Sequence, residues 1–250
     1  MSDSKFSKLF DCFVISLERT PERLKIFREK NRKSQVDFQH FKAVDGALLN
    51  LSDIYGSVVA ANATRYTSGM IGNAMSHRTL WQRCVDQENN FIVCEDDAVL
   101  RDDFKARLTP LVEGIGEWDI IQLGYNLDVP LEIEISPGII CGGGFSVTYP
   151  SPDQLADFAR STNVVALHRL NFSLGVCGYA ISPKGARTLL DTCFPMDNRP
   201  VLCVSVSKTF PAFGLDCLMA TLYPKIAAYA CVAPLVMTPN DRNISLTKRG

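Results

Sequence analysis

Apolar and polar residues follow one another along this chain in a pattern that predicts strands alternating with helices. Short apolar runs at residues 13–17, 38–44, 91–94, 118–124 and 176–181 are typical of buried strands. Helices are expected from residue 21 to about 33, from 68 onward, from 152, and from 183 to about 192, each preceded by Ser or Thr as a capping residue. Strongly apolar strands that alternate with helices predict an α/β fold, a mostly parallel sheet with helices on both faces.

Two long segments show neither a helical nor a strand period. Residues 127–149 and 194–213 are therefore expected to be loops, and long loops in such folds usually belong to the functional site or to a mobile lid.

Length and charge limit the classes of protein to consider. No linker divides the 250 residues, so we expect a single domain over 1–250. The formal net charge of -1, without a basic block, argues against nucleic acid as a partner. The N-terminus lacks the apolar core of a signal peptide, and the apolar run at 226–237 is broken by Pro234 and too short to span a bilayer. We expect a soluble, cytoplasmic protein.

Several widespread catalytic motifs are missing from the sequence. It contains no GxxxxGK[ST] loop, no GxGxxG after the first strand, no HExxH and no GxSxG. The common nucleoside triphosphatase, dehydrogenase and serine hydrolase classes are therefore excluded.

Three adjacent carboxylates, Glu95, Asp96 and Asp97, directly follow one of the predicted buried strands. Packed together they repel, and each raises the pKa of its neighbours unless a cation or several hydrogen-bond donors neutralise them. Mg²⁺ or Mn²⁺ suits such oxygen ligands, and ligands of open α/β sheets bind beyond the carboxyl ends of strands. The alternative is that Asp96, Asp97, Asp102 and Asp103 cap the next helix, and for Asp102 and Asp103 we prefer this role.

Six segments in order resemble glycosyltransferase family 25, the bacterial lipooligosaccharide galactosyltransferases related to the collagen galactosyltransferases. They are residues 14–19 with Arg23, 41–46, 69–77 with Leu80 and Trp81, 95–99, 178–186 and 214–216. The resemblance covers about residues 13–236 and leaves a C-terminal tail at 237–250. Met70 and Asn73 depart from the family, which commonly has an acidic residue and a cysteine there, so the site is less acidic than the resemblance implies.

The resemblance implies a GT-A-type, Rossmann-like enzyme with a UDP-sugar donor, a metal held by the acidic triplet, and inversion at the anomeric carbon. The expected activity is metal-dependent transfer of a hexose, galactose from UDP-galactose, to a lipooligosaccharide or other surface glycan. The acceptor, a glycan or glycolipid, would be met by peripheral contact at the inner face of the cytoplasmic membrane. Alternatives are a UDP-glucose or UDP-N-acetylglucosamine donor, a non-catalytic nucleotide-sugar-binding relative, and a metal-dependent phosphohydrolase.

The resemblance also assigns roles to single residues. Glu95 and Asp97 would hold Mn²⁺ or Mg²⁺, with Asp96 beside them near the donor, because a metal acts as a Lewis acid where the leaving diphosphate gains charge. Asp216 is the candidate general base that takes the proton of the acceptor hydroxyl. Its alternative role is the N-cap of the helix that follows.

The remaining candidates would surround the donor. Arg19 and Arg23 can bind phosphate in a fork, although both can also be solvated residues at a helix start. Asp45 and Gly46 would contact the ribose or the sugar, or form a plain Asx turn. Ser76 and His77 occupy the family's Ser-His position near the donor or the metal, whereas a lone helical histidine is commonly a packed residue.

Overall fold

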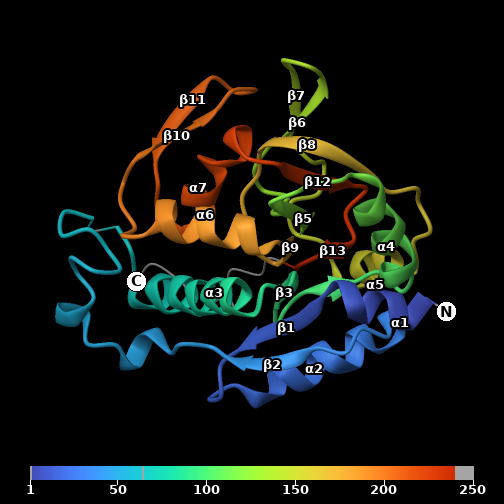
Figure 1. Ribbon diagram of the computed structural model, residues 1–250, viewed down its shortest axis with the longest axis horizontal. Coiled ribbons are helices and arrows are strands. Elements are labelled where there is room, and N and C mark those ends of the chain that lie inside the picture. The colour runs from blue at the N-terminus through green and yellow to red at the C-terminus, as the bar shows by residue number, and fades with distance from the viewer. Residues whose placement is uncertain (1, 64, 240–250) are drawn as a thin grey trace.

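A nine-stranded sheet runs through the middle of the molecule in this computed structural model, which describes residues 2–63 and 65–239. The strand order among these residues is β2-β1-β3-β9-β5-β12-β8-β6-β7 (Figure 1). The strands of the sheet are β1 (Asp11–Ser16), β2 (Gln39–Lys42), β3 (Phe91–Glu95), β5 (Ile120–Gly124), β6 (Leu131–Ser136), β7 (Ile139–Gly143), β8 (Ala166–Phe172), β9 (Gly178–Ile181) and β12 (Ala228–Val232). Two further pairs are β4 (Val99–Leu100) with β13 (Val236–Met237) and β10 (Pro200–Cys203) with β11 (Lys208–Pro211).

Strand directions are mixed. β1 lies parallel to both β2 and β3, and β5 lies parallel to β12. β9 runs antiparallel between β3 and β5, and β8, β6 and β7 continue antiparallel to the far edge. The predicted α/β class with a central sheet flanked by helices is confirmed.

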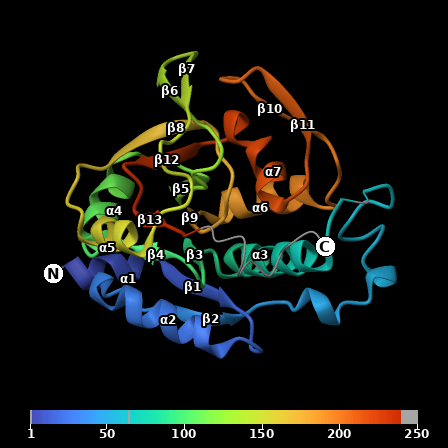
Figure 2. The same ribbon diagram turned by 180° about the vertical axis from the view of Figure 1, so that it is seen from behind.

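Helices cover both faces of the sheet, as Figures 1 and 2 show. One face packs against α1 (Ser2–Leu9), α2 (Pro21–Asn31) and α4 (Phe104–Gly114), and the other against α3 (Ser68–Gln87), α6 (Pro183–Cys193) and α7 (Leu215–Ala220). The strand period explains this double burial: in β1, Phe13 and Ile15 enter the core beneath α3, whereas Cys12 and Val14 enter the core beneath α2. α5 (Pro152–Arg160) lies beside β4. The short 3-10 helices are η1 (Arg32–Ser34), η2 (Gly46–Leu48), η3 (Leu51–Asp53) and η4 (Tyr223–Lys225).

The helix starts predicted from Ser, Thr and Pro are confirmed. The Thr67 side chain accepts a hydrogen bond from the backbone N–H of Met70 and begins α3. Ser151 and Gln154 form a capping box at the start of α5. α2 begins at Pro21, and η1 extends it to about the predicted end.

The two segments expected to be loops contain hairpins, so this prediction was wrong. β6 pairs with β7, and β10 pairs with β11; both hairpins project from the same side of the molecule in Figures 1 and 2. The buried carboxylate of Glu132 joins them, because it accepts hydrogen bonds from Ser205 N at 2.6 Å and from Asn171 Nδ2 at 2.7 Å. All five residues of β7 are exposed at the edge of the sheet.

Two expectations concern membranes and the C-terminus. In the part of the chain that the structure describes, no helix is long and apolar enough to cross a membrane. The expected tail at 237–250 lies outside the described residues from 240 on.

Candidate functional site

A cleft of about 380 Å³ opens where β1 and β3 end, the position expected for a ligand of an α/β sheet. Segments far apart in the sequence meet there, including the starts of α3 and α7. The cleft contains nine of the residues predicted from the sequence: Arg19, Arg23, Asp45, Gly46, Ser76, Glu95, Asp96, Asp97 and Asp216. His77 does not line it.

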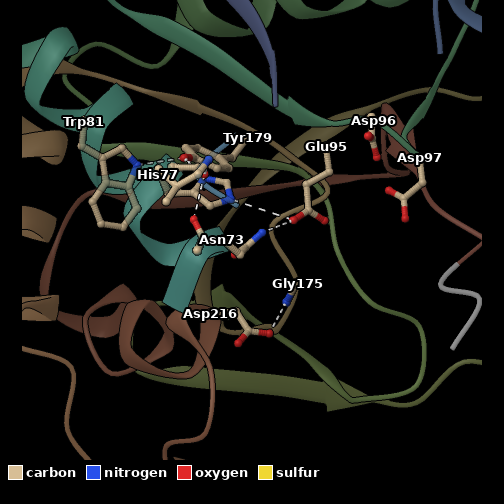
Figure 3. Close-up of polar contacts among 12 residues, drawn as sticks. Asn73, His77, Trp81, Glu95, Asp96, Asp97, Gly175, Tyr179 and Asp216 are labelled. Atoms are coloured by element: carbon tan, nitrogen blue, oxygen red, sulfur yellow. Dashed lines mark hydrogen bonds and ion pairs between the residues drawn. The ribbon is translucent and has the colours of Figure 1, made fainter. Parts of the chain in front are cut away.

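Glu95 is the last residue of β3 and its carboxylate is held from α3. Its Oε1 accepts a hydrogen bond from Asn73 Nδ2 at 2.6 Å and lies 4.0 Å from His77 Nε2 (Figure 3). Burial raises the pKa of Glu95, but His77, Asn73 and Arg23 together outweigh burial and bring that pKa below its usual value. Glu95 is therefore held as a carboxylate.

The pKa of Asp97 is shifted in the opposite direction from that of Glu95. Burial raises its pKa to about 7, and the negative charge of Glu95 adds to the effect, although Arg23 opposes it. Its Oδ2 lies 3.8 Å from Arg23 Nη2, and its Oδ1 is buried without a hydrogen-bond partner among the described residues. A buried carboxylate oxygen without a donor, next to a second carboxylate, is a site that a cation would satisfy.

The fit of a metal is nevertheless incomplete when only the protein is counted. No group of three or more His, Cys, Asp or Glu side chains within residues 2–63 and 65–239 could hold a metal ion. The Glu95 and Asp97 pair suits Mg²⁺ or Mn²⁺ only where substrate phosphates and waters complete the ligand set, which is common for Mg²⁺.

Asp96 forms a buried ion pair with Arg23. It accepts hydrogen bonds from Arg23 Nε at 2.7 Å, from Arg23 Nη2, and from Ser16 Oγ at 2.7 Å. The side chain is buried. Asp96 thus positions Arg23 at the cleft wall, and its predicted contact with the donor stays a prediction.

The turn after β2 forms the neighbouring wall. Asp45 accepts a hydrogen bond from Arg19 Nε at 2.6 Å and caps η2 by accepting one from Ala47 N at 3.0 Å. The Asx-type turn proposed as an alternative for Asp45 is present, while the residue still lines the cleft.

Gly46 and Gly72 let this turn approach α3 at backbone distance. A Cβ on Gly46 would lie 1.9 Å from Ser68 O, and one on Gly72 would lie 2.6 Å from Val44 O. Ser76 closes the contact, donating to Gly72 O and accepting from Val44 N, each at 2.8 Å. Gly46 and Ser76 therefore have packing roles that hold the cleft wall.

Asp216 is the second residue of α7, whose N-cap is Gly214, so the N-cap alternative for Asp216 is wrong. Its Oδ2 accepts a hydrogen bond from Gly175 N at 2.9 Å, and its Oδ1 accepts one from Cys217 N at 2.9 Å. Burial raises the pKa of Asp216 above its ordinary value despite these donors. An aspartate with a raised pKa on a cleft wall is a better proton acceptor than an ordinary carboxylate.

Among the cleft residues that were not predicted from the sequence are Asn126, Gly175 and Thr238, and Asn73 was noted there only as a departure from the family. Asn126 had a usable signal, because it follows the apolar run of β5 as the triplet follows β3. Gly175 and Thr238 come from segments without a local signal, so only the tertiary fold reveals them.

The comparisons with known proteins agree with this arrangement. The family model for "Glycosyltransferase family 25 (LPS biosynthesis protein)" matches residues 10–201, and the chain belongs to this family. "Inactive glycosyltransferase 25 family member 3" of Mus musculus is 30% identical over 184 residues, covering 66% of this chain and 31% of that protein. "Procollagen galactosyltransferase 2" of Mus musculus is 25% identical over 193 residues, covering 72% of this chain and 27% of that protein.

The matched region is thus about three-tenths of the length of these relatives. Among solved structures, A197 from STIV matches 96% of this chain and 98% of its own with 12% identity and a TM-score of 0.37, which is too low to bear on the fold.

Proposed function

We propose that this chain is a metal-dependent inverting glycosyltransferase that transfers galactose from UDP-galactose to a lipooligosaccharide or another surface glycan. The observation that carries the proposal is the buried, unpartnered Oδ1 of Asp97 beside Glu95 in the cleft. Family membership supports sugar transfer, and the relative named as a procollagen galactosyltransferase supports galactose.

Glu95 and Asp97 would hold the Mn²⁺ or Mg²⁺. When bound, the metal would stabilise the negative charge that develops on the leaving diphosphate. The lowered pKa of Glu95 keeps this first ligand charged. The positive charge of the metal would favour the ionised form of Asp97 and so lower its pKa from about 7.

Two arginines would meet the diphosphate, and one of them, Arg23, lies next to the metal ligand Asp97. The side chain of Arg23 is 23% exposed and already bound to Asp96, whereas that of Arg19 is 49% exposed and held by Asp45. Arg19 can therefore turn toward a ligand at lower cost, while Arg23 supplies fixed positive charge. Asp45 would accept a hydrogen bond from the ribose or the sugar.

Asp216 would take the proton of the acceptor hydroxyl as that oxygen attacks the anomeric carbon. Its two oxygens accept hydrogen bonds from the backbone N–H groups of Gly175 and Cys217 and from the Cys217 side chain, and a carboxylate with about four lone-pair sites can still accept one from the acceptor hydroxyl. A glycolipid acceptor would be reached by peripheral contact with the cytoplasmic face of the membrane, as the sequence predicts.

The test is release of UDP from a panel of UDP-sugars, with Mn²⁺, with Mg²⁺ and with excess chelator. Metal-dependent release with UDP-galactose supports the proposal, and preference for UDP-glucose or UDP-N-acetylglucosamine would replace the donor. Binding of UDP without turnover of any donor would favour a non-catalytic role, which the similarity to a relative named inactive makes a specific alternative. Equal turnover in chelator would refute metal dependence.

A further inference from the structure

A buried chain of three ring-bearing side chains ends at Glu95. Trp81 and His77 belong to α3 and Tyr179 to β9, and all three are 0% exposed. Trp81 Nε1 donates a hydrogen bond to the Tyr179 hydroxyl at 2.8 Å, and that hydroxyl lies 2.8 Å from His77 Nδ1. Figure 3 shows the chain continuing from the other side of the imidazole toward Glu95. Because Tyr179 is fully buried, it cannot stack on a sugar in the cleft.

The number of hydrogens available along this hydrogen-bonded series determines the tautomer of the His77 imidazole. An indole N–H can only donate, so the Tyr179 oxygen accepts from Trp81. The hydroxyl carries one hydrogen, and the acceptor within its reach among the described residues is His77 Nδ1. Nδ1 therefore bears no hydrogen, and the hydrogen of the ring is on Nε2.

The opposite tautomer would leave a hydrogen bond unmade inside the core. With a hydrogen on Nδ1, the Tyr179 oxygen would receive two donors and its own hydrogen would face no acceptor. With the hydrogen on Nε2, that N–H makes no hydrogen bond but faces the Glu95 carboxylate 4.0 Å away. In the opposite tautomer a bare Nε2 would face the carboxylate and the hydroxyl hydrogen would face no acceptor, and no solvent reaches these groups to compensate.

His77 Nε2 faces the candidate metal ligand. It is buried without a hydrogen-bond partner among the described residues, and Glu95 Oε1 is 4.0 Å away. We propose that Tyr179 and Trp81 are positioning residues: they fix the Nε2–H tautomer of His77. The Nε2–H then directs its positive end toward Oε1 of Glu95, which Asn73 holds by a hydrogen bond, and Oε2 is left available to a divalent metal. This inference rests on the proposed function, since it assigns the support of the same metal site.

The tautomer is measured directly by ¹⁵N NMR of the imidazoles in the metal-free, full-length protein. The His77 signals are assigned by their loss in His77→Gln, because His40 and His168 supply the other histidine signals. The expected wild-type result is a neutral ring with its hydrogen on Nε2. In Tyr179→Phe the constraint on Nδ1 is gone, and the spectrum should show a mixture of tautomers.

Mn²⁺ binding tests the consequence for the site. With UDP present to complete the ligand set, Tyr179→Phe should weaken Mn²⁺ binding roughly tenfold. This is the lower end of the usual effect of disturbing the outer contacts of a metal ligand, because Tyr179 acts on Glu95 through His77. Tyr66→Phe is the matched control: it removes another buried tyrosine hydroxyl, one that donates to Asp197 O at 2.6 Å. It should lower stability comparably but leave the His77 tautomer and Mn²⁺ affinity unchanged.

A wild-type ring protonated on Nδ1, or on both nitrogens, overturns the proposal. So does a Tyr179→Phe protein with wild-type Mn²⁺ affinity, or one affected no more than Tyr66→Phe. The wild-type spectrum decides the tautomer even where Tyr179→Phe does not fold. A wild-type protein that shows the Nε2–H ring but binds no Mn²⁺ in the presence of UDP contradicts the proposed metal site, and leaves the assigned tautomer intact.

Discussion

Replacing Asp97 with asparagine should stabilise the metal-free protein at alkaline pH while removing its response to metal. The pKa of Asp97 is raised from 3.8 to about 7, so its neutral form is favoured in the folded state. For such a group the stabilising contribution is fully present below the unfolded pKa near 4 and is lost as the pH rises through about 7. Wild type therefore carries an unfavourable buried charge at pH 8 that Asp97→Asn lacks.

The size of the effect follows from the shift. At 1.36 kcal/mol per pKa unit, a rise from 3.8 to about 7 corresponds to about 4 kcal/mol at pH 8. Asparagine is also buried at the same place and loses the attraction of Arg23, so we expect about half of this, roughly 2 kcal/mol. For a chain of this length that is an increase in Tm of about 4–8 °C.

Urea unfolding at pH 5 and pH 8, with UDP and either with or without Mn²⁺, measures each part. Asp97→Asn should gain stability over wild type at pH 8 and much less at pH 5. Mn²⁺ should stabilise the wild type but not Asp97→Asn. Asp103→Asn is the control of opposite sign, because Arg101 and Arg107 lower the pKa of Asp103 against the effect of burial. It should lose roughly 3 kcal/mol at pH 8 by leaving the buried Arg101 without its carboxylate. An Asp97→Asn protein less stable than wild type at pH 8 would refute the reasoning.

Four further substitutions test the cleft. Arg19→Ala should weaken UDP binding by roughly 1.5–3 kcal/mol in calorimetric titrations at little cost in stability. Arg23→Ala should weaken UDP binding and also lower the unfolding free energy, because it leaves the buried carboxylate of Asp96 without its ion-pair partner. Unchanged UDP affinity in both variants would withdraw the diphosphate role. Asp216→Asn should still bind UDP with metal but lose about a hundred- to ten-thousandfold in transfer rate and the ascending limb of the pH–rate profile, and transfer within a few-fold of wild type would exclude it as the base. Gly46→Ala should strongly destabilise the protein in urea unfolding because its Cβ would meet backbone of α3 at 1.9 Å, whereas Gly143→Ala, with no atom within 4 Å, should not.

Local patterns in the sequence were sufficient for the main elements of the fold. Capping residues marked the starts of α3 and α5, and apolar runs marked β1, β3, β5 and β9, because each signal lies within a few residues of the element it defines. The hairpins were missed for a physical reason. β7 has no buried residue to give it a period, and β6 buries Glu132, whose partners Asn171 and Ser205 come from distant strands and loops.

The site could be predicted only in part. The triplet is visible because its residues are adjacent, and Asp216 became a candidate through the family resemblance. The three carboxylates look alike in the sequence, yet Asp96 is engaged by Arg23 while Asp97 keeps an oxygen without a partner. Contacts such as Trp81 with Tyr179, separated by 98 residues, depend on the packing of α3 on β9 and have no local signature.

The exposed edge strand β7 has a consequence for handling this protein. Its backbone N–H and C=O groups on the outer side face no further strand among the described residues, and Ile139 and Ile140 are 56% and 36% exposed. An open edge that carries apolar side chains is a template on which other chains can add as strands. Concentrated samples should therefore self-associate through this hairpin, and a charged residue in place of Ile140 is the substitution that would keep them dispersed for crystallisation without touching the cleft.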